Sequence, residues 1–132
     1  MPVVRRLTGV YDADGSLRGE LAYVVGRALG RRHCSLCDIT HGRVREKEAW
    51  RACRDGLPVP FETVHLDERS AEVRVASDGS APCVLAHTDT GLSVLVGAAA
   101  LEACGGDPQR LVDLLEAAVV ARGLSWAPGA CG

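Results

Sequence analysis

Residues 81–97, with the sequence APCVLAHTDTGLSVLVG, constrain the fold of this chain more than any other segment. Two runs of β-forming and apolar residues flank the turn sequence Thr-Asp-Thr-Gly at positions 88–91. Short β-forming runs joined by a polar turn that contains glycine are typical of a β-hairpin. We therefore expect two antiparallel strands here, and the rest of the chain must fold around them.

A helix is predicted at the C-terminal side of this hairpin. Residues 98–104 predict one or two helical turns that end at Gly105 and Gly106. Asp107 is then a suitable N-cap, with Pro108 at the first helical position and Gly123 at the end. The residues expected on the buried face of this last helix are Leu111, Leu114, Leu115, Ala118 and Val119.

The first half of the chain predicts a strand, two helices and a second strand. Residues 3–13 read as a strand that ends in the turn at 12–16. Ser16 would cap a helix that ends at Gly30, and Thr40 would cap a helix ending at Gly56. Residues 60–68 alternate like a strand, whereas residues 71–76 fit either a short helix or an edge strand.

These elements predict an α/β fold, a small mixed sheet flanked by helices. The 132 residues suit one domain, expected over residues 1–124, with 125–132 as a loose tail. No nucleic-acid partner is expected, because the net charge is −2 and the arginines are scattered among acids. No signal peptide or membrane span is recognisable, so a cytoplasmic location is expected and the six cysteines suggest thiols, metal ligands or redox groups.

The second half, roughly residues 61–122, resembles the thioredoxin-like superfamily. The similar features are a strand with an acid at its end (VHLDE), a proline just before a strand (APCVL), the hairpin turn and the final helix. The resemblance implies a thioredoxin-like sandwich in which Pro82 is cis and its loop lies against an active-site dithiol. In that family the dithiol follows the first strand, whereas here Cys34 and Cys37 come after a further predicted helix.

The segment RRHCSLCDITHG, residues 31–42, is the main candidate for chemistry. Cys34 and Cys37 have the spacing that lets two sulfurs share one ion, and on a helix His41 would lie on the same face as Cys37. His33 is a further possible ligand. Thiolates with imidazole favour zinc or copper(I), and no organic cofactor is expected. The fourth ligand would be water or one of Cys53, His65, Cys83 and His87.

Two other interpretations use the same segment. In a thiol–disulfide oxidoreductase, Cys34 would attack a disulfide of a partner protein and Cys37 would resolve the mixed disulfide. His33 and Arg32 would favour the thiolate, although Asp38 would oppose it. Alternatively the cysteines only pack as small apolar groups. The leading hypothesis is the metal site.

A different motif lies at the end of the first strand. The sequence VYDADGSL is similar to the haloacid-dehalogenase phosphatase signature, which implies Asp12 as nucleophile, Asp14 as general acid/base and a magnesium ion. Thr88, Asp107 and Asp113 would supply the later motifs of that family. The single lysine, Lys47, precedes Thr88 instead of following it. Magnesium-dependent phosphatase activity is therefore a lesser alternative.

Overall fold

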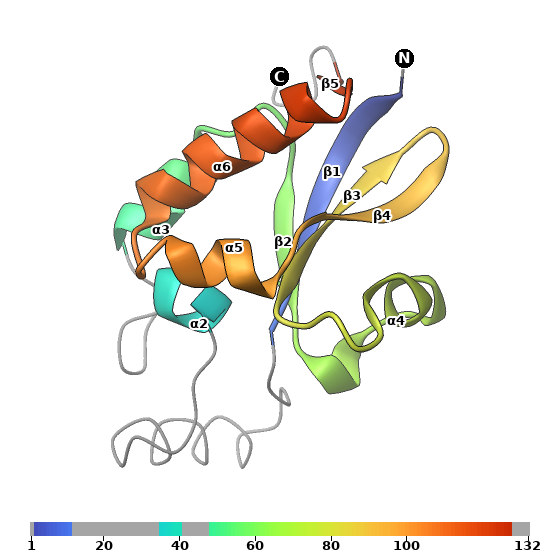
Figure 1. The fold of residues 1–132 in the computed structure, drawn as a ribbon, viewed down its shortest axis with the longest axis horizontal. Coiled ribbons are helices and arrows are strands. Elements are labelled where there is room, and N and C mark those ends of the chain that lie inside the picture. The colour runs from blue at the N-terminus through green and yellow to red at the C-terminus, as the bar shows by residue number, and fades with distance from the viewer. Residues whose placement is uncertain (1, 12–34, 41–47, 128–132) are drawn as a thin grey trace.

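The computed structural model describes residues 2–11, 35–40 and 48–127, which form a mixed β-sheet between two layers of helices (Figure 1). The predicted α/β class is confirmed. The strands are β1 (Val3–Val10), β2 (Phe61–Val64), β3 (Cys83–Thr88), β4 (Gly91–Val96) and β5 (Ser125–Trp126). The helices are α2 (Ser35–Thr40), α3 (Glu48–Asp55), η1 (Leu66–Glu68, a 3-10 turn), α4 (Ala71–Ser77), α5 (Ala98–Ala103) and α6 (Pro108–Ala121).

The sheet has the strand order β2-β1-β3-β4. β1 runs parallel to β2, while β3 is antiparallel to both of its neighbours β1 and β4. Val10, the last residue of β1, pairs with Val64 on one side and with Cys83 on the other. The carboxyl ends of the two parallel strands and the start of β3 therefore form one edge of the sheet, which we call the carboxyl edge.

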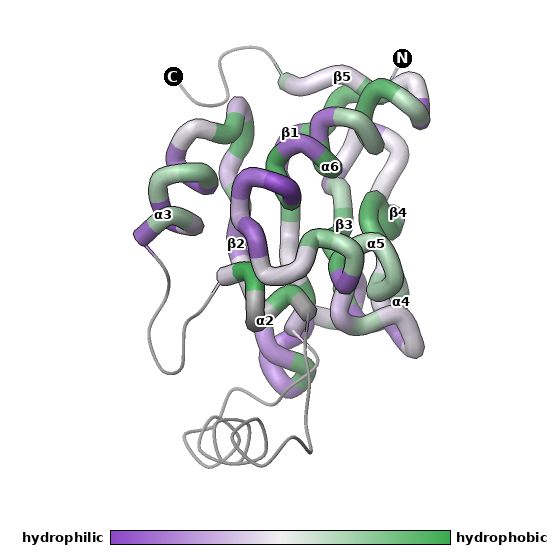
Figure 2. The backbone as a smooth tube through the Cα atoms, turned by 60° about the vertical axis from the view of Figure 1, so that its left-hand side comes forward, coloured by the Kyte–Doolittle hydropathy of each residue, from purple (hydrophilic) through white to green (hydrophobic). Residues whose placement is uncertain are grey.

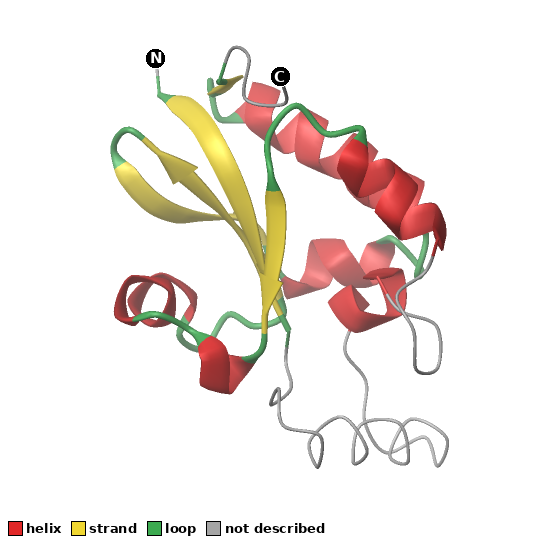
Figure 3. Cartoon of the chain, turned by 180° about the vertical axis from the view of Figure 1, so that it is seen from behind, coloured by secondary structure: helices red, strands yellow, loops and turns green. Residues whose placement is uncertain are grey.

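Four helices cover one face of the sheet and α4 covers part of the other (Figures 1 and 3). The four-helix side holds the larger apolar core, to which α2, α3, α5 and α6 contribute Leu36, Ile39, Trp50, Leu101, Leu111, Leu115 and Val119. The α4 side holds a smaller cluster of Val10, Val73, Cys83 and Leu85. Figure 2 shows how hydrophobic and hydrophilic residues alternate along α6, as expected for a helix with one buried face.

The hairpin and the last helix form where the sequence predicts them. β3 and β4 pair around the turn at residues 89–90, and Gly91 has a φ of 117°, which favours glycine. Asp107 caps α6 by accepting a hydrogen bond from the backbone nitrogen of Gln109 at 3.0 Å, and Pro108 is the first helical residue. The peptide bond between Ala81 and Pro82 is cis, as the thioredoxin resemblance implies.

Three details of the predicted elements are wrong. Thr40 does not cap a helix: it ends α2, where its hydroxyl donates to the carbonyl of Leu36 at 3.2 Å. The strand expected over residues 60–68 ends at Val64, because the carboxylate of Glu68 binds the backbone nitrogen of His65 and starts the turn η1. The tail is not loose at its start, since Ser125 and Trp126 pair with Val3 and Val4 of β1.

Other predictions have mixed outcomes. Residues 71–77 form a helix, which resolves the ambiguity there. The helix predicted from Ser16 to Gly30 and the end of the tail lie outside the described residues. None of the helices within the described ranges combines the length and apolar character needed to cross a membrane.

Candidate functional site

The helix α2, which contains Cys37, is fixed to the carboxyl edge of the sheet. Leu36 and Ile39 of this helix are completely buried in the four-helix core. The hydroxyl oxygen of Tyr11, the residue that follows β1, lies 2.9 Å from the hydroxyl oxygen of Thr40. Apolar packing and this buried hydrogen bond together hold the helix against the end of β1.

A glycine in β1 makes this close packing possible. A Cβ atom at Gly9 would lie 3.1 Å from Leu36 Cδ2 and 3.1 Å from Phe61 Cε1, closer than ordinary van der Waals contact. Leu36 therefore reaches the backbone of the sheet because position 9 has no side chain. The glycine at position 9 of β1 therefore leaves room for Leu36, the residue before Cys37.

The predicted ligands are described only in part. Cys37 is the third residue of α2, with its side chain outside the described part, and Cys34, His33 and His41 lie outside the described residues altogether. Asp12, Asp14 and Lys47 lie outside them as well. Among the residues that the structure does describe, no three His, Cys, Asp or Glu side chains gather as a metal-binding group.

His65 is one of two fourth-ligand candidates at the carboxyl edge; the other is Cys83, the first residue of β3. His65 follows β2 directly, and its ring is tilted by 50° against the ring of Tyr11 with 5.0 Å between the centroids. Its Nδ1 lies 2.7 Å from Oε1 of Glu68. Hydrogen bonds from the backbone and side chain of His65 lower the pKa of Glu68, so this group is an ionised carboxylate at neutral pH.

Two of the other candidates, Cys83 and Cys53, are cysteines with contacts of their own. Cys83 is buried in the α4-side cluster, and burial raises the pKa of its thiol to about 11 although Arg69 lowers it. Cys53 on α3 makes a long contact of 3.9 Å to the side-chain oxygen of Gln109. The second buried thiol, Cys104, belongs to the four-helix core, and burial raises its pKa too.

His87 belongs to a polar chain across the sheet face that α4 leaves open. Its Nε2 lies 2.7 Å from Thr8 Oγ1, and its Nδ1 lies 3.3 Å from Nε of Arg6. Because an arginine Nε always carries a hydrogen, Nδ1 accepts and the neutral ring donates through Nε2. The Thr8 hydroxyl then donates to Glu62 Oε1 at 3.1 Å, so each of the three hydrogen bonds from Arg6 to Glu62 has a fixed direction.

This polar chain does not activate a nucleophile. Thr8 is 1% exposed, and the nitrogen that faces its hydroxyl carries a hydrogen, so His87 does not act as a base toward it. Burial lowers the pKa of His87 and Arg6 lowers it further, whereas Glu62 and Glu72 raise it. The ring is therefore neutral near pH 7. The hydrogen bonds of this polar chain link β1, β2 and β3 and help to hold the strands in register.

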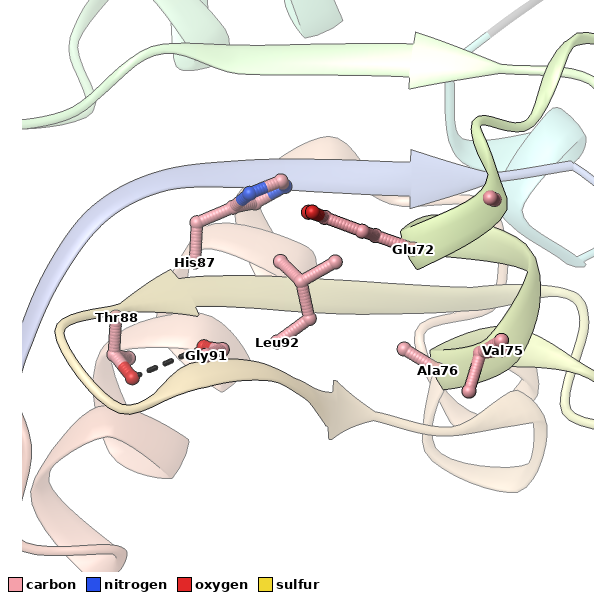
Figure 4. Close-up of a pocket in the computed structure, with 8 residues that line it drawn as sticks. Glu72, Val75, Ala76, His87, Thr88, Gly91 and Leu92 are labelled. Carbon is pink, nitrogen blue, oxygen red and sulfur yellow. Dashed lines mark hydrogen bonds between the residues drawn. The ribbon is translucent and has the colours of Figure 1, made fainter.

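An open groove lies beside His87, between α4 and the β3–β4 hairpin. Its volume is about 640 Å³, and its walls include Glu72, Val75 and Leu92. Figure 4 shows the side chains of His87 and Glu72 pointing toward one another across it. The sequence did not indicate this groove, because its two walls meet only where α4 packs against the β3–β4 hairpin.

The residues proposed for the later phosphatase motifs have local structural partners. The Thr88 hydroxyl donates to the carbonyl of Gly91 at 3.1 Å within the hairpin. Asp107 caps α6, and Asp113 accepts a hydrogen bond from the side chain of Gln109 at 3.0 Å. These contacts explain the three residues as a turn residue, a cap and a helix-surface residue.

Comparisons of the chain with protein-family models, with curated proteins and with solved structures gave no match.

Proposed function

We propose that this protein binds a transition-metal ion, zinc in the first place or copper(I), through Cys34, Cys37 and His41. The Cys-x-x-Cys spacing, followed by a histidine four positions later, supplies two thiolates and an imidazole to a tetrahedral ion. His33, next to Cys34, is the alternative nitrogen ligand. The metal would neutralise the two thiolates, which Asp38 otherwise disfavours.

The observation that carries this proposal is the hydrogen bond between Tyr11 and Thr40. It ties the helix that contains Cys37 to the carboxyl ends of the parallel strands, the edge at which open α/β sheets commonly bind ligands. Leu36 and Ile39 hold the same helix through the core. A ligand on α2 would therefore start from a rigid position, which favours binding because less conformational entropy is lost.

The test is the metal content and zinc affinity of the full chain, purified under reducing conditions without chelator. We expect near-stoichiometric metal in the wild type and its loss in Cys34→Ser and in Cys37→Ser. The matched control is Cys53→Ser, which removes a thiol on α3 and should leave metal binding unchanged. Metal-free wild-type protein, or unchanged zinc affinity in Cys34→Ser, would refute the proposal.

A thiol–disulfide oxidoreductase with Cys34 as the attacking and Cys37 as the resolving thiol is the second candidate. It is favoured by the pairing of Val10 with Cys83, which brings the Pro82 segment to the same edge as α2. The thioredoxin resemblance implies such a proximity of a proline loop and a dithiol. Reduction of insulin disulfides that disappears in Cys34→Ser would support this candidate, and no turnover by the wild type would remove it.

A further inference from the structure

The two edges of the sheet differ in how they are protected against further strand pairing. One edge consists of β2, which has four residues, carries Glu62 and follows Pro60, and of β5, which has two residues. Short strands, charges and prolines are features by which natural sheets block an edge. The other edge is β4, whose sequence GLSVLV has no charge and no proline, and among the described residues no strand pairs with its outer side. β4 is therefore the edge that can accept a further strand.

The regular part of this edge lies beside the groove between α4 and the hairpin. A register shift in the pairing of β3 with β4 leaves Leu95 as an extra residue, so residues 91–94 form the regular stretch, which we call the free edge. Gly91 and Ser93 of this stretch are exposed, and Gly91 and Leu92 line the groove. A strand added here would run along β4 and place alternate side chains over the groove.

The groove is apolar on the side of the free edge. In Figure 4, Val75 and Ala76 of α4 lie on the side of β4, whereas Glu72 extends away from it toward His87. Val75 is 83% exposed, and the other large apolar side chain that is mainly exposed in the described part of the chain, Val120, lies on α6 at the opposite face of the sheet. A single exposed valine needs no explanation, but beside an uncharged free edge it extends an apolar surface.

We propose that the free edge binds a second copy of this chain, with the two β4 strands antiparallel in a two-fold dimer that has one continuous sheet. A two-fold axis places β4 beside itself, so any charge on the strand would meet the same charge, and β4 has none. The nearby acids are turned elsewhere, because Glu72 extends toward His87 and Asp89 of the hairpin turn pairs with Arg5 at 2.7 Å. Since the opposite edge is blocked, pairing stops at two copies and does not continue as a fibre. This inference does not rest on the proposed metal-binding function.

Strand pairing supplies only part of such an interface. Stable interfaces bury about 1,200–2,000 Å² in total, and the backbone of a short strand does not provide this area alone. We therefore expect Val75 and Leu92 of both copies to add apolar contacts beside the paired strands. The resulting dimer should be weak and in equilibrium with the monomer.

The experiment measures the monomer–dimer equilibrium of the full chain by sedimentation equilibrium, from low micromolar to several hundred micromolar concentrations. A reducing agent excludes disulfide-linked dimers, and a parallel series with chelator excludes metal-bridged ones, so we expect the wild type to dimerise in both. Ser93→Lys brings like charges together across the strand pair and should weaken dimerisation by about tenfold. Val75→Lys should weaken it less. Val120→Lys is the matched control, because it adds the same charge at an exposed valine on the other face and should change nothing.

Hydrogen exchange of the backbone amides in residues 91–96 locates the interface. Exchange should slow as the concentration of the wild type rises and should stay constant in Ser93→Lys. A wild type that is monomeric throughout, or a dimer that neither Ser93→Lys nor Val75→Lys weakens, would overturn the inference. Slow exchange that does not depend on concentration would also overturn it, because another segment of the same chain would then cover the edge. Larger oligomers would contradict it as well, since they require a second open edge.

Discussion

The two faces of the sheet differ in how they are covered and in what that cover does. The four-helix face is closed by a large apolar core, in which Leu7, Leu36 and Leu115 are completely buried. The α4 face is half open, and a directed chain of hydrogen bonds from Arg6 to Glu62 crosses its open part. The comparison indicates that burial stabilises the first face, whereas polar contacts mainly set strand register on the second.

The largest expected effect is on the closed face. Leu36→Ala removes a completely buried side chain from α2, and the cavity left behind should lower the free energy of unfolding by about 3 kcal/mol. Val75→Ala on α4, where the side chain is 83% exposed, should change it by less than about 0.5 kcal/mol. Urea denaturation of both variants measures the contrast, and equal midpoints would contradict it.

Gly9→Ala tests the same face by adding an atom instead of removing some. The new Cβ would meet Leu36 Cδ2 and Phe61 Cε1, both at 3.1 Å, so we expect a loss of about 1–2 kcal/mol from overpacking. Gly56→Ala is the matched control, because its nearest neighbours would lie at 3.6 Å. A Gly9→Ala protein as stable as the wild type would show that α2 is free to shift away from β1.

The open face should respond to the loss of one hydroxyl group. Thr8→Val keeps the shape but leaves Nε2 of His87 without its acceptor, and Glu62 loses the Thr8 donor while keeping its contact with Arg6 at 3.5 Å, which should cost about 1 kcal/mol. Thr90→Val in the exposed hairpin turn is the control and should cost less. Thermal or urea unfolding measures both, and a neutral Thr8→Val would show that the polar chain does not hold the strands.

The smallest expected effect is a pH dependence on this same face. The pKa of His87 is lower in the folded chain than its ordinary value, because burial and Arg6 disfavour the charged ring. The neutral His87 ring therefore makes its full contribution to the free energy of unfolding above the unfolded pKa of about 6.5. This contribution is lost as the pH falls through the folded pKa.

The difference in unfolding free energy between the wild type and His87→Gln should accordingly shrink when the pH is lowered from 8 to 5. Denaturant titrations at several pH values between these limits measure it. A difference that grows on acidification would mean that Glu62 and Glu72 dominate the surroundings of His87 and raise its pKa instead of lowering it.

The parts of the fold that the sequence predicted are those with local signals. The hairpin needed only a turn between β-forming runs, and α6 needed only a cap, a proline and a periodic apolar face. Thr40 was misjudged because a threonine suits a cap equally well, whereas in the structure it is the last residue of α2 and contacts Tyr11. β5 is two residues long, and its pairing with β1 has no signal in its own sequence.

The candidate site was predictable as a set of residue types but not as an arrangement. The thiol spacing is visible in the chain, whereas the environment of His65 depends on Tyr11, which is far away in sequence and meets it only because β1 and β2 are parallel neighbours. The sequence does contain one relevant signal, a glutamate three residues after His65. The contact between Thr8 and His87 likewise requires the register of β1 against β3.

Two buried cysteines on opposite faces of the sheet allow local unfolding of each helical layer to be measured separately. Cys83 lies under α4 and Cys104 in the four-helix core, so a thiol reagent reaches each of them only when its own side of the sheet opens. Labelling rates for the two sites, resolved by peptide mass spectrometry, would therefore give the opening free energies of the two layers in one molecule. No substitution or attached probe would be needed to learn which layer loosens first.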